Sequence, residues 1–154
     1  MKFFDAVKIC FVKYTNFSDR ASRSEFWLFM LFTLIVEFML MFFDPMIVGV
    51  PFEEYSNPLA SLSMVFFIAT FIPQLSVMVR RLHDVNRSWW WMLPFPVLML
   101  YGLVFSESGK EEVPVGLLMP LILTFIWLIL LVFWCCQRGN EEENRFGPNP
   151  LSKD

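Results

Sequence analysis

The chain has 154 residues, of which 56% are hydrophobic and 18% are charged, and its formal net charge is −3. Soluble domains contain about 45–50% apolar and about 25% charged residues, and a short domain buries only about two thirds of its unfolded surface. We therefore expect lipid to cover part of this chain. The acidic balance gives no support to nucleic-acid binding, which requires a basic patch. Three cysteines, one histidine and the lack of a Cys-x-x-Cys pair predict no disulfide framework, no metal site and no cofactor.

Residues 1–25 are predicted to form an arm that lies in the membrane interface. Apolar side chains recur there at the three- and four-residue spacing of an amphipathic helix. They are Phe4, Val7, Phe11 and Tyr14. Charged residues interrupt the arm too often for a cleavable signal peptide. The run Ser22–Glu25, Ser-Arg-Ser-Glu, is typical of a capping box at the start of a helix.

Four apolar segments follow, and each is long enough to cross the hydrocarbon core, which requires a helix of about 20 residues. They comprise residues 26–43, 59–79, 89–105 and 116–136, and a polar tail of loop or partly disordered chain, 137–154, comes last. The sequence thus predicts a single all-α membrane domain, residues 1–154, built as a bundle of four transmembrane helices. Pro73, Pro94 and Pro96 are expected to kink two of them.

The distribution of lysine and arginine predicts the orientation of these helices. The arm, the connection at 80–88 and the tail together carry eleven of these residues, whereas the other two connections carry one, Lys110. Because basic residues collect on the cytoplasmic side of a membrane, we expect both ends of the chain to be cytoplasmic.

Glu37 is the one ionisable residue inside a predicted span. A carboxyl group at this depth is costly and normally faces the bundle or a water-filled cavity. One interpretation is a proton or cation site. The other is a protonated, structural carboxyl group that is hydrogen-bonded to a neighbouring helix.

Residues 80–88, with three arginines, one aspartate and the histidine, form a predicted connection between two spans. They indicate either a basic loop that fixes topology and touches lipid phosphates, or a site. In a site, Asp84 would orient His83 or pair with an arginine, and the remaining guanidinium groups would bind an anion. Catalysis by His83 and Asp84 would further require a nucleophile or a metal, and the sequence offers no recognisable one.

Three stretches carry a resemblance to a known family. They are Phe17–Trp27, Arg80–Trp90 with its Arg-Arg-Leu-His-Asp run, and Gly139–Pro150. Together they resemble the small bacterial inner-membrane proteins catalogued as domain of unknown function 805, the YhaH/YhaI-like family. The resemblance implies a multi-pass protein of the bacterial inner (plasma) membrane. It implies no activity, because the family itself is uncharacterised.

All three stretches fall on the cytoplasmic side of the predicted topology, where we expect their polar side chains to converge in one cluster. The predicted members are Arg20, Arg23, Glu25, Arg80, Arg81, His83, Asp84, Arg87, Asn144 and Arg145. The leading hypothesis is a non-enzymatic membrane protein whose cluster organises the bundle. Membrane lipids with anionic headgroups, a partner protein or further copies of the chain are its candidate partners. The alternatives are a small transporter or channel that uses Glu37 and the proline-kinked helices, and a membrane enzyme acting on a lipid headgroup.

Overall fold

The computed structural model describes residues 1–49, 61–94, 100 and 115–152. These residues form four α-helices and one short 3-10 helix. The elements are α1 (Phe3–Val12), α2 (Arg23–Val48), α3 (Leu62–Asp84), η3 (Trp89–Met92) and α5 (Val115–Cys136). The described part of the chain contains no β-strand, only an isolated bridge between Asn144 and Gly147. The predicted all-α class is confirmed.

Three of the helices are long and apolar enough to cross a membrane, over Arg23–Ile47, Leu62–Asp84 and Leu118–Cys136. They correspond to the first, second and fourth predicted spans. Large apolar side chains point outward from them, as lipid-facing side chains do; Phe42 of α2 and Phe125 of α5 are 73% and 67% exposed. Most of the predicted third span, 89–105, lies outside the described residues.

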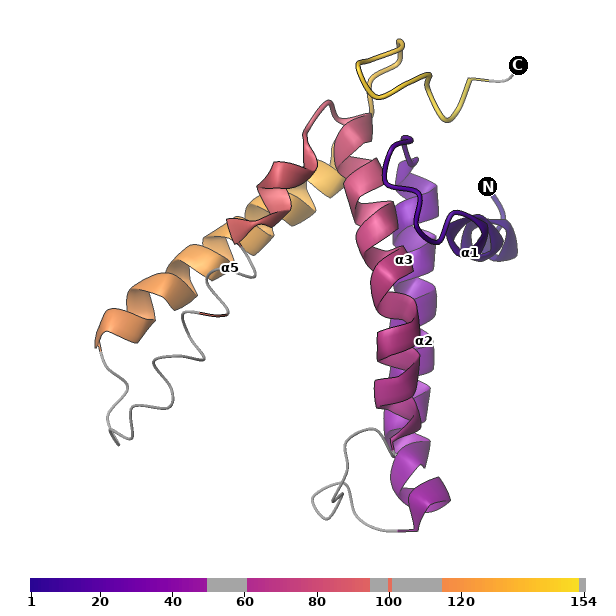
Figure 1. Ribbon diagram of the computed structural model, residues 1–154, viewed down its shortest axis with the longest axis vertical. Coiled ribbons are helices and arrows are strands. Elements are labelled where there is room, and N and C mark those ends of the chain that lie inside the picture. The colour runs from indigo at the N-terminus through magenta and orange to yellow at the C-terminus, as the bar shows by residue number, and fades with distance from the viewer. Residues whose placement is uncertain (50–60, 95–99, 101–114, 153–154) are drawn as a thin grey trace.

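Figure 1 shows α2 and α3 side by side in opposite directions, while α5 diverges from the end of α3. The N-terminus of α2 therefore lies at the same end of the bundle as the C-termini of α3 and α5, and we call this end the helix junction. A small apolar core lies there, and α1 packs beside it. Its buried members are Cys10, Ala21, Phe26, Phe29, Val77 and Cys135.

Helices α2 and α3 both extend beyond the predicted spans, which ended at Phe43 and Val79. Helix α3 ends at Asp84, so the run Arg80–Asp84 forms its last turn and does not belong to a loop. Hydropathy marks only the stretch that favours lipid, whereas arginine and leucine continue a helix readily. Arg81 and His83 in the last turn also suit the negative end of the helix dipole.

Helix α1 is present in the predicted arm, and it packs against the bundle through its small side chains. Ala6 and Cys10 are fully buried, whereas Phe4 is 81% exposed. Small side chains let α1 approach α2 closely, and the ring of Phe11 then packs edge-on against that of Phe29.

At the far end of the helix pair, Asp44 of α2 caps the start of α3. Its carboxylate accepts hydrogen bonds from the backbone N–H groups of Leu62 at 2.9 Å and Ser63 at 3.0 Å, and from the Ser61 hydroxyl at 2.7 Å. The first N–H groups of a helix have no partner within it, which explains why a carboxylate is fully buried here. The helix pair is therefore held by polar contacts at both ends.

Candidate functional site

Asp84, at the end of α3, is the centre of a buried network of charged groups at the helix junction. Its Oδ1 accepts hydrogen bonds from Nε and Nη2 of Arg20, at 3.0 and 2.8 Å. Its Oδ2 accepts one from Nη1 of Arg81. The carboxylate thus binds two guanidinium groups that come from different segments, and the exposed fraction of each of these three residues is at most 4%.

Arg81 also binds the end of α5. Its Nε donates to the carbonyl oxygen of Cys135 at 3.0 Å and its Nη2 to that of Gln137, and Nη1 lies 3.4 Å from the Ala21 carbonyl oxygen. The last carbonyl groups of a helix have no partner within it and carry partial negative charge. Arg81 therefore caps α5 and fastens its end to α3.

Arg20 holds the tail in the same way. Its Nη1 donates to the carbonyl oxygens of Glu142 at 2.9 Å and Gly147 at 3.1 Å, and its Nη2 donates to that of Asn140. A single carboxylate, Asp84, cannot balance both Arg20 and Arg81, and the backbone carbonyl oxygens of the tail supply further partners for the Arg20 guanidinium group. Because these carbonyl groups bind one side chain, they fix the path of the tail over the junction.

Further contacts order the tail, which the sequence predicted to be loop or partly disordered. Its described residues, 137–152, form no helix. The Asn140 N–H nevertheless donates to the carbonyl oxygen of Asp84 at 2.9 Å, and Nδ2 of Asn144 donates to that of His83 at 2.9 Å. The Phe146 ring stacks on the His83 ring, with centroids 3.8 Å apart. Polar composition alone did not reveal these partners.

A second buried ion pair joins Arg80 of α3 to Glu25 of α2. The predicted cap is confirmed, since the Ser22 hydroxyl accepts the Glu25 N–H at 3.2 Å, but the Glu25 carboxylate pairs with Arg80. The Cys10 thiol of α1 lies 3.9 Å from this carboxylate. Burial, and then the charge of Glu25, raise the pKa of this thiol to about 12, so it stays protonated.

His83 is buried beside the network without belonging to it. Its Nδ1 lies 3.3 Å from the carbonyl oxygen of Asp19. No hydrogen bond joins it to Asp84 in the described part of the chain, and its Nε2 has no partner there. Asp84 therefore does not orient the imidazole as a catalytic pair would require.

Arg87 lies outside the network, against the tryptophans of η3 and α5. Its guanidinium carbon is 4.8 Å from the ring centroid of Trp134 and 5.6 Å from that of Trp91. Trp127, the tryptophan in the middle of α5, donates from Nε1 to the Trp91 carbonyl oxygen at 2.9 Å. These contacts dock η3 on α5 and give Arg87 a cation–π partner in place of a carboxylate.

Two other predicted members are exposed at the edge of the network. Arg145 donates from Nη2 to the Asn86 carbonyl oxygen at 3.2 Å and lies over the Phe146 ring. Arg23, in the first turn of α2, makes no ion pair with any described residue. The same described ranges contain no group of three His, Cys, Asp or Glu side chains that could hold a metal ion.

The comparisons with known proteins identify the family. Residues 14–148 match the family described as "Protein of unknown function (DUF805)". The chain belongs to this family. It is 35% identical over 138 residues to "Inner membrane protein YhaH" of Escherichia coli (strain K12), covering 89% of this chain and 88% of that protein. It is 34% identical over 137 residues to "Inner membrane protein YhaI" of the same strain, covering 89% and 87%. No solved structure matches the chain significantly.

The match to the DUF805 family confirms the resemblance that the three motif stretches carry. Every member of the buried network lies within residues 14–148. Together with the three apolar helices, the names of the relatives identify this family member as a multi-pass protein of the bacterial inner membrane.

Glu37 lies apart from the network, within α2. Its Oε1 is buried, and no described residue hydrogen-bonds to it. Thr124 of α5 donates its hydroxyl hydrogen to the Pro120 carbonyl oxygen of its own helix at 2.7 Å.

The part that Gly139 has in the network was not predicted from the sequence. A Cβ atom at this position would lie 1.9 Å from Oδ2 of Asp84. The tail backbone thus passes directly over the carboxylate, which only a residue without a side chain permits. The pair Gly139-Asn140 was part of the family resemblance, but nothing local indicates a close approach to a residue 55 positions earlier.

Proposed function

We propose that this DUF805 protein is a non-enzymatic membrane protein whose buried network organises the cytoplasmic end of its helical bundle. The observation that carries this proposal is the Asp84 carboxylate, which pairs with Arg20 of the arm and Arg81 of α3. Through these two arginines a single carboxylate connects the arm, α3, α5 and the tail. The charged groups of the network bind one another and backbone carbonyl groups, and His83 lacks a catalytic partner. Both observations favour a structural role over a catalytic one.

The network also supports the predicted topology. Helices α3 and α5 both end at the junction, so α5 begins at the opposite end of the bundle. The chain would then cross the membrane an odd number of times between the end of α3 and the start of α5, as a bundle of four spans with both chain ends in the cytoplasm requires. Single cysteines at Glu53 and Glu111, in a variant without the native cysteines, are expected to react with a membrane-impermeant maleimide in intact cells. Cysteines at Asn86 and Lys153 are expected to react only after permeabilisation. Labelling of Lys153→Cys from outside would contradict the topology.

The organising role predicts that Arg20→Gln releases the tail. The charged guanidinium group of Arg20 makes three strong hydrogen bonds to tail carbonyl oxygens. Glutamine is shorter, uncharged and has fewer donors, so it cannot replace them. We expect trypsin to cut after Arg138 and Arg145 roughly tenfold faster or more in this variant than in the wild-type protein, because cleavage follows the population of the open tail. Mass spectrometry of the purified protein in detergent would measure the rates.

The matched control is Lys13→Gln, which also removes one cation from the arm. Its partner is Asp19, and the two side chains are 37% and 44% exposed, so the tail is expected to remain protected. Equal tail cleavage in the wild-type protein and Arg20→Gln would contradict the proposed role of the network.

The buried Oε1 of Glu37, without a partner among the described residues, favours a second candidate, a proton or cation pathway. Under the organising role, Glu37→Gln should leave the melting temperature nearly unchanged, because glutamine keeps the shape and a hydrogen-bonding group. Glu37→Ala should lower it further. Proton and cation uptake into proteoliposomes distinguishes the candidates, since a flux that Glu37→Gln abolishes would establish the pathway.

A further inference from the structure

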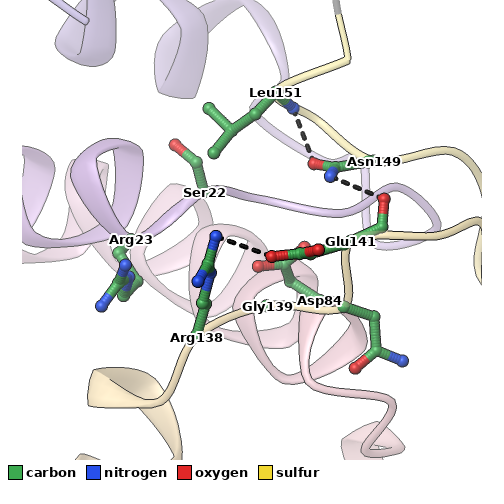
Figure 2. Close-up of a pocket in the computed structure, with 9 residues that line it drawn as sticks. Ser22, Arg23, Asp84, Arg138, Gly139, Glu141, Asn149 and Leu151 are labelled. Atoms are coloured by element: carbon green, nitrogen blue, oxygen red, sulfur yellow. Dashed lines mark hydrogen bonds and ion pairs between the residues drawn. The ribbon is translucent and has the colours of Figure 1, made fainter.

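An open cavity of about 500 Å³ adjoins the buried network at the helix junction. It lies where α2 begins and the tail passes over the end of α3. Figure 2 shows Arg23 and Arg138 toward one side of it and Glu141 and Asn149 toward the other. Its lining residues are Ser22, Arg23, Asp84, Arg138, Gly139, Asn140, Glu141, Asn149 and Leu151. The volume is in the range of small-molecule sites, which is about 300–1,000 Å³.

The charges around this cavity favour an anion. The Asp84 carboxylate in its wall is already paired with two buried guanidinium groups. Among the described residues Arg23 makes no ion pair, and Arg138 pairs with Glu141 alone, at 2.6 Å, where the two side chains are 78% and 70% exposed. Such a surface pair is weak and exchanges readily for a better partner. Four guanidinium groups therefore surround two carboxylates, and two of the four are accessible.

The geometry points to a phosphate ester as the ligand. A planar guanidinium group donates two parallel hydrogen bonds to phosphate oxygens. The first turn of α2, which begins at Arg23, adds the partial positive charge of a helix N-terminus. The cavity exceeds the size of an inorganic anion and leaves space for the alcohol half of an ester.

The cavity lies at the depth in the membrane where phospholipid headgroups are found. Arg23 is the first residue of the apolar helix α2. The apolar helix α5 ends at Cys136, two residues before Arg138. Both arginines therefore lie where hydrocarbon gives way to headgroups, the depth at which arginines meet lipid phosphates.

We propose that Arg23 and Arg138 form a binding site for a phosphate ester, as carried by an anionic phospholipid headgroup or a small soluble phosphorylated metabolite. This inference deepens the proposed function, because the network forms one wall of the cavity. It is tested separately, because neither arginine holds the network together.

The experiment compares three proteins at one ionic strength. They are the wild-type chain, the double variant Arg23→Gln/Arg138→Gln, and the control Lys2→Gln/Lys8→Gln, which removes two exposed cations from the N-terminal arm. The probes are phosphatidylglycerol against phosphatidylcholine in micelles of an uncharged detergent, and glycerol 3-phosphate in solution. The readouts are native mass spectrometry of the bound ligand and the shift of the melting temperature.

We expect saturable binding of one ligand to the wild-type and control proteins, and binding weaker by about tenfold or more for the double variant, since a charge-assisted hydrogen bond has this magnitude. Without ligand, all three should melt at similar temperatures. Binding of phosphatidylglycerol alone would identify a lipid site, and binding of glycerol 3-phosphate a site for a soluble ester. Binding of neither probe, unchanged binding by the double variant, or an equal loss in the control would overturn the proposal.

Discussion

Replacing Asp84 by asparagine is expected to lower the free energy of unfolding by about 3–5 kcal/mol, the usual effect of removing one member of a buried ion pair. Asparagine keeps the shape of the side chain, but its amide cannot balance Arg20 and Arg81, which are both almost completely buried. Two guanidinium groups would then be left without an anion in a poorly solvated place, where their mutual repulsion is strong.

Unfolding of the purified protein by a denaturing detergent, followed by circular dichroism, would measure this effect. Asp19→Asn is the matched control, because it makes the same chemical change in the exposed Lys13–Asp19 pair, and we expect it to cost about 0–1 kcal/mol. Arg87→Gln removes a cation from two tryptophan rings and should cost about 1 kcal/mol. Similar losses for Asp84→Asn and Asp19→Asn would show that the network contributes no more than a surface pair.

The second large effect is expected at Gly139, where alanine should cost about 3 kcal/mol or more. The three heavy atoms nearest to the added Cβ, at 1.9, 2.5 and 2.8 Å, all belong to the Asp84 carboxylate. Either the tail or the carboxylate has to move, and the carboxylate is held by two arginines. Gly49→Ala is the control, since nothing lies within 4 Å of that Cβ and its left-handed backbone costs only about 1–2 kcal/mol.

A double-mutant cycle separates this contact from a general loss of stability. In an Asp84→Ala background the three nearest atoms are absent, so the added methyl group of Gly139→Ala should cost far less than in the wild-type chain. Contacting residues normally couple in this way, by about 0.5–3 kcal/mol. Additive losses would show that Gly139 is required for another reason.

The fold class and three membrane helices could be predicted because lipid imposes a local rule on the sequence, a long run of predominantly apolar residues. Two observations together predicted that Arg20, Glu25, Arg80, Arg81 and Asp84 belong to one cluster. These residues lie in the stretches that carry the family resemblance, and the distribution of lysine and arginine assigns all of these stretches to one side of the membrane.

The pairings within that region were not predictable, because each depends on contacts between distant segments. The sequence around Glu25 indicates a cap, and its pairing with Arg80 appears only when α2 and α3 pack together. Nothing in the local sequence distinguishes Arg87 from Arg80 and Arg81, yet its guanidinium group lies against the tryptophan rings of η3 and α5 instead of a carboxylate. The order of the tail has the same origin, since its partners are the carbonyl oxygens of α3 and the side chain of Arg20.

The path of the tail makes the buried network depend on segments that lie far apart in the sequence. Arg20 finds its carboxylate 64 positions later and its carbonyl partners in Glu142 and Gly147 only after 122 and 127 positions. A nascent chain can therefore insert α2 and α3 before Arg20 has its carbonyl partners. We expect the contacts that close the helix junction to form only after residues 140–147 have been added, so the junction assembles later than the helix pair on which it rests.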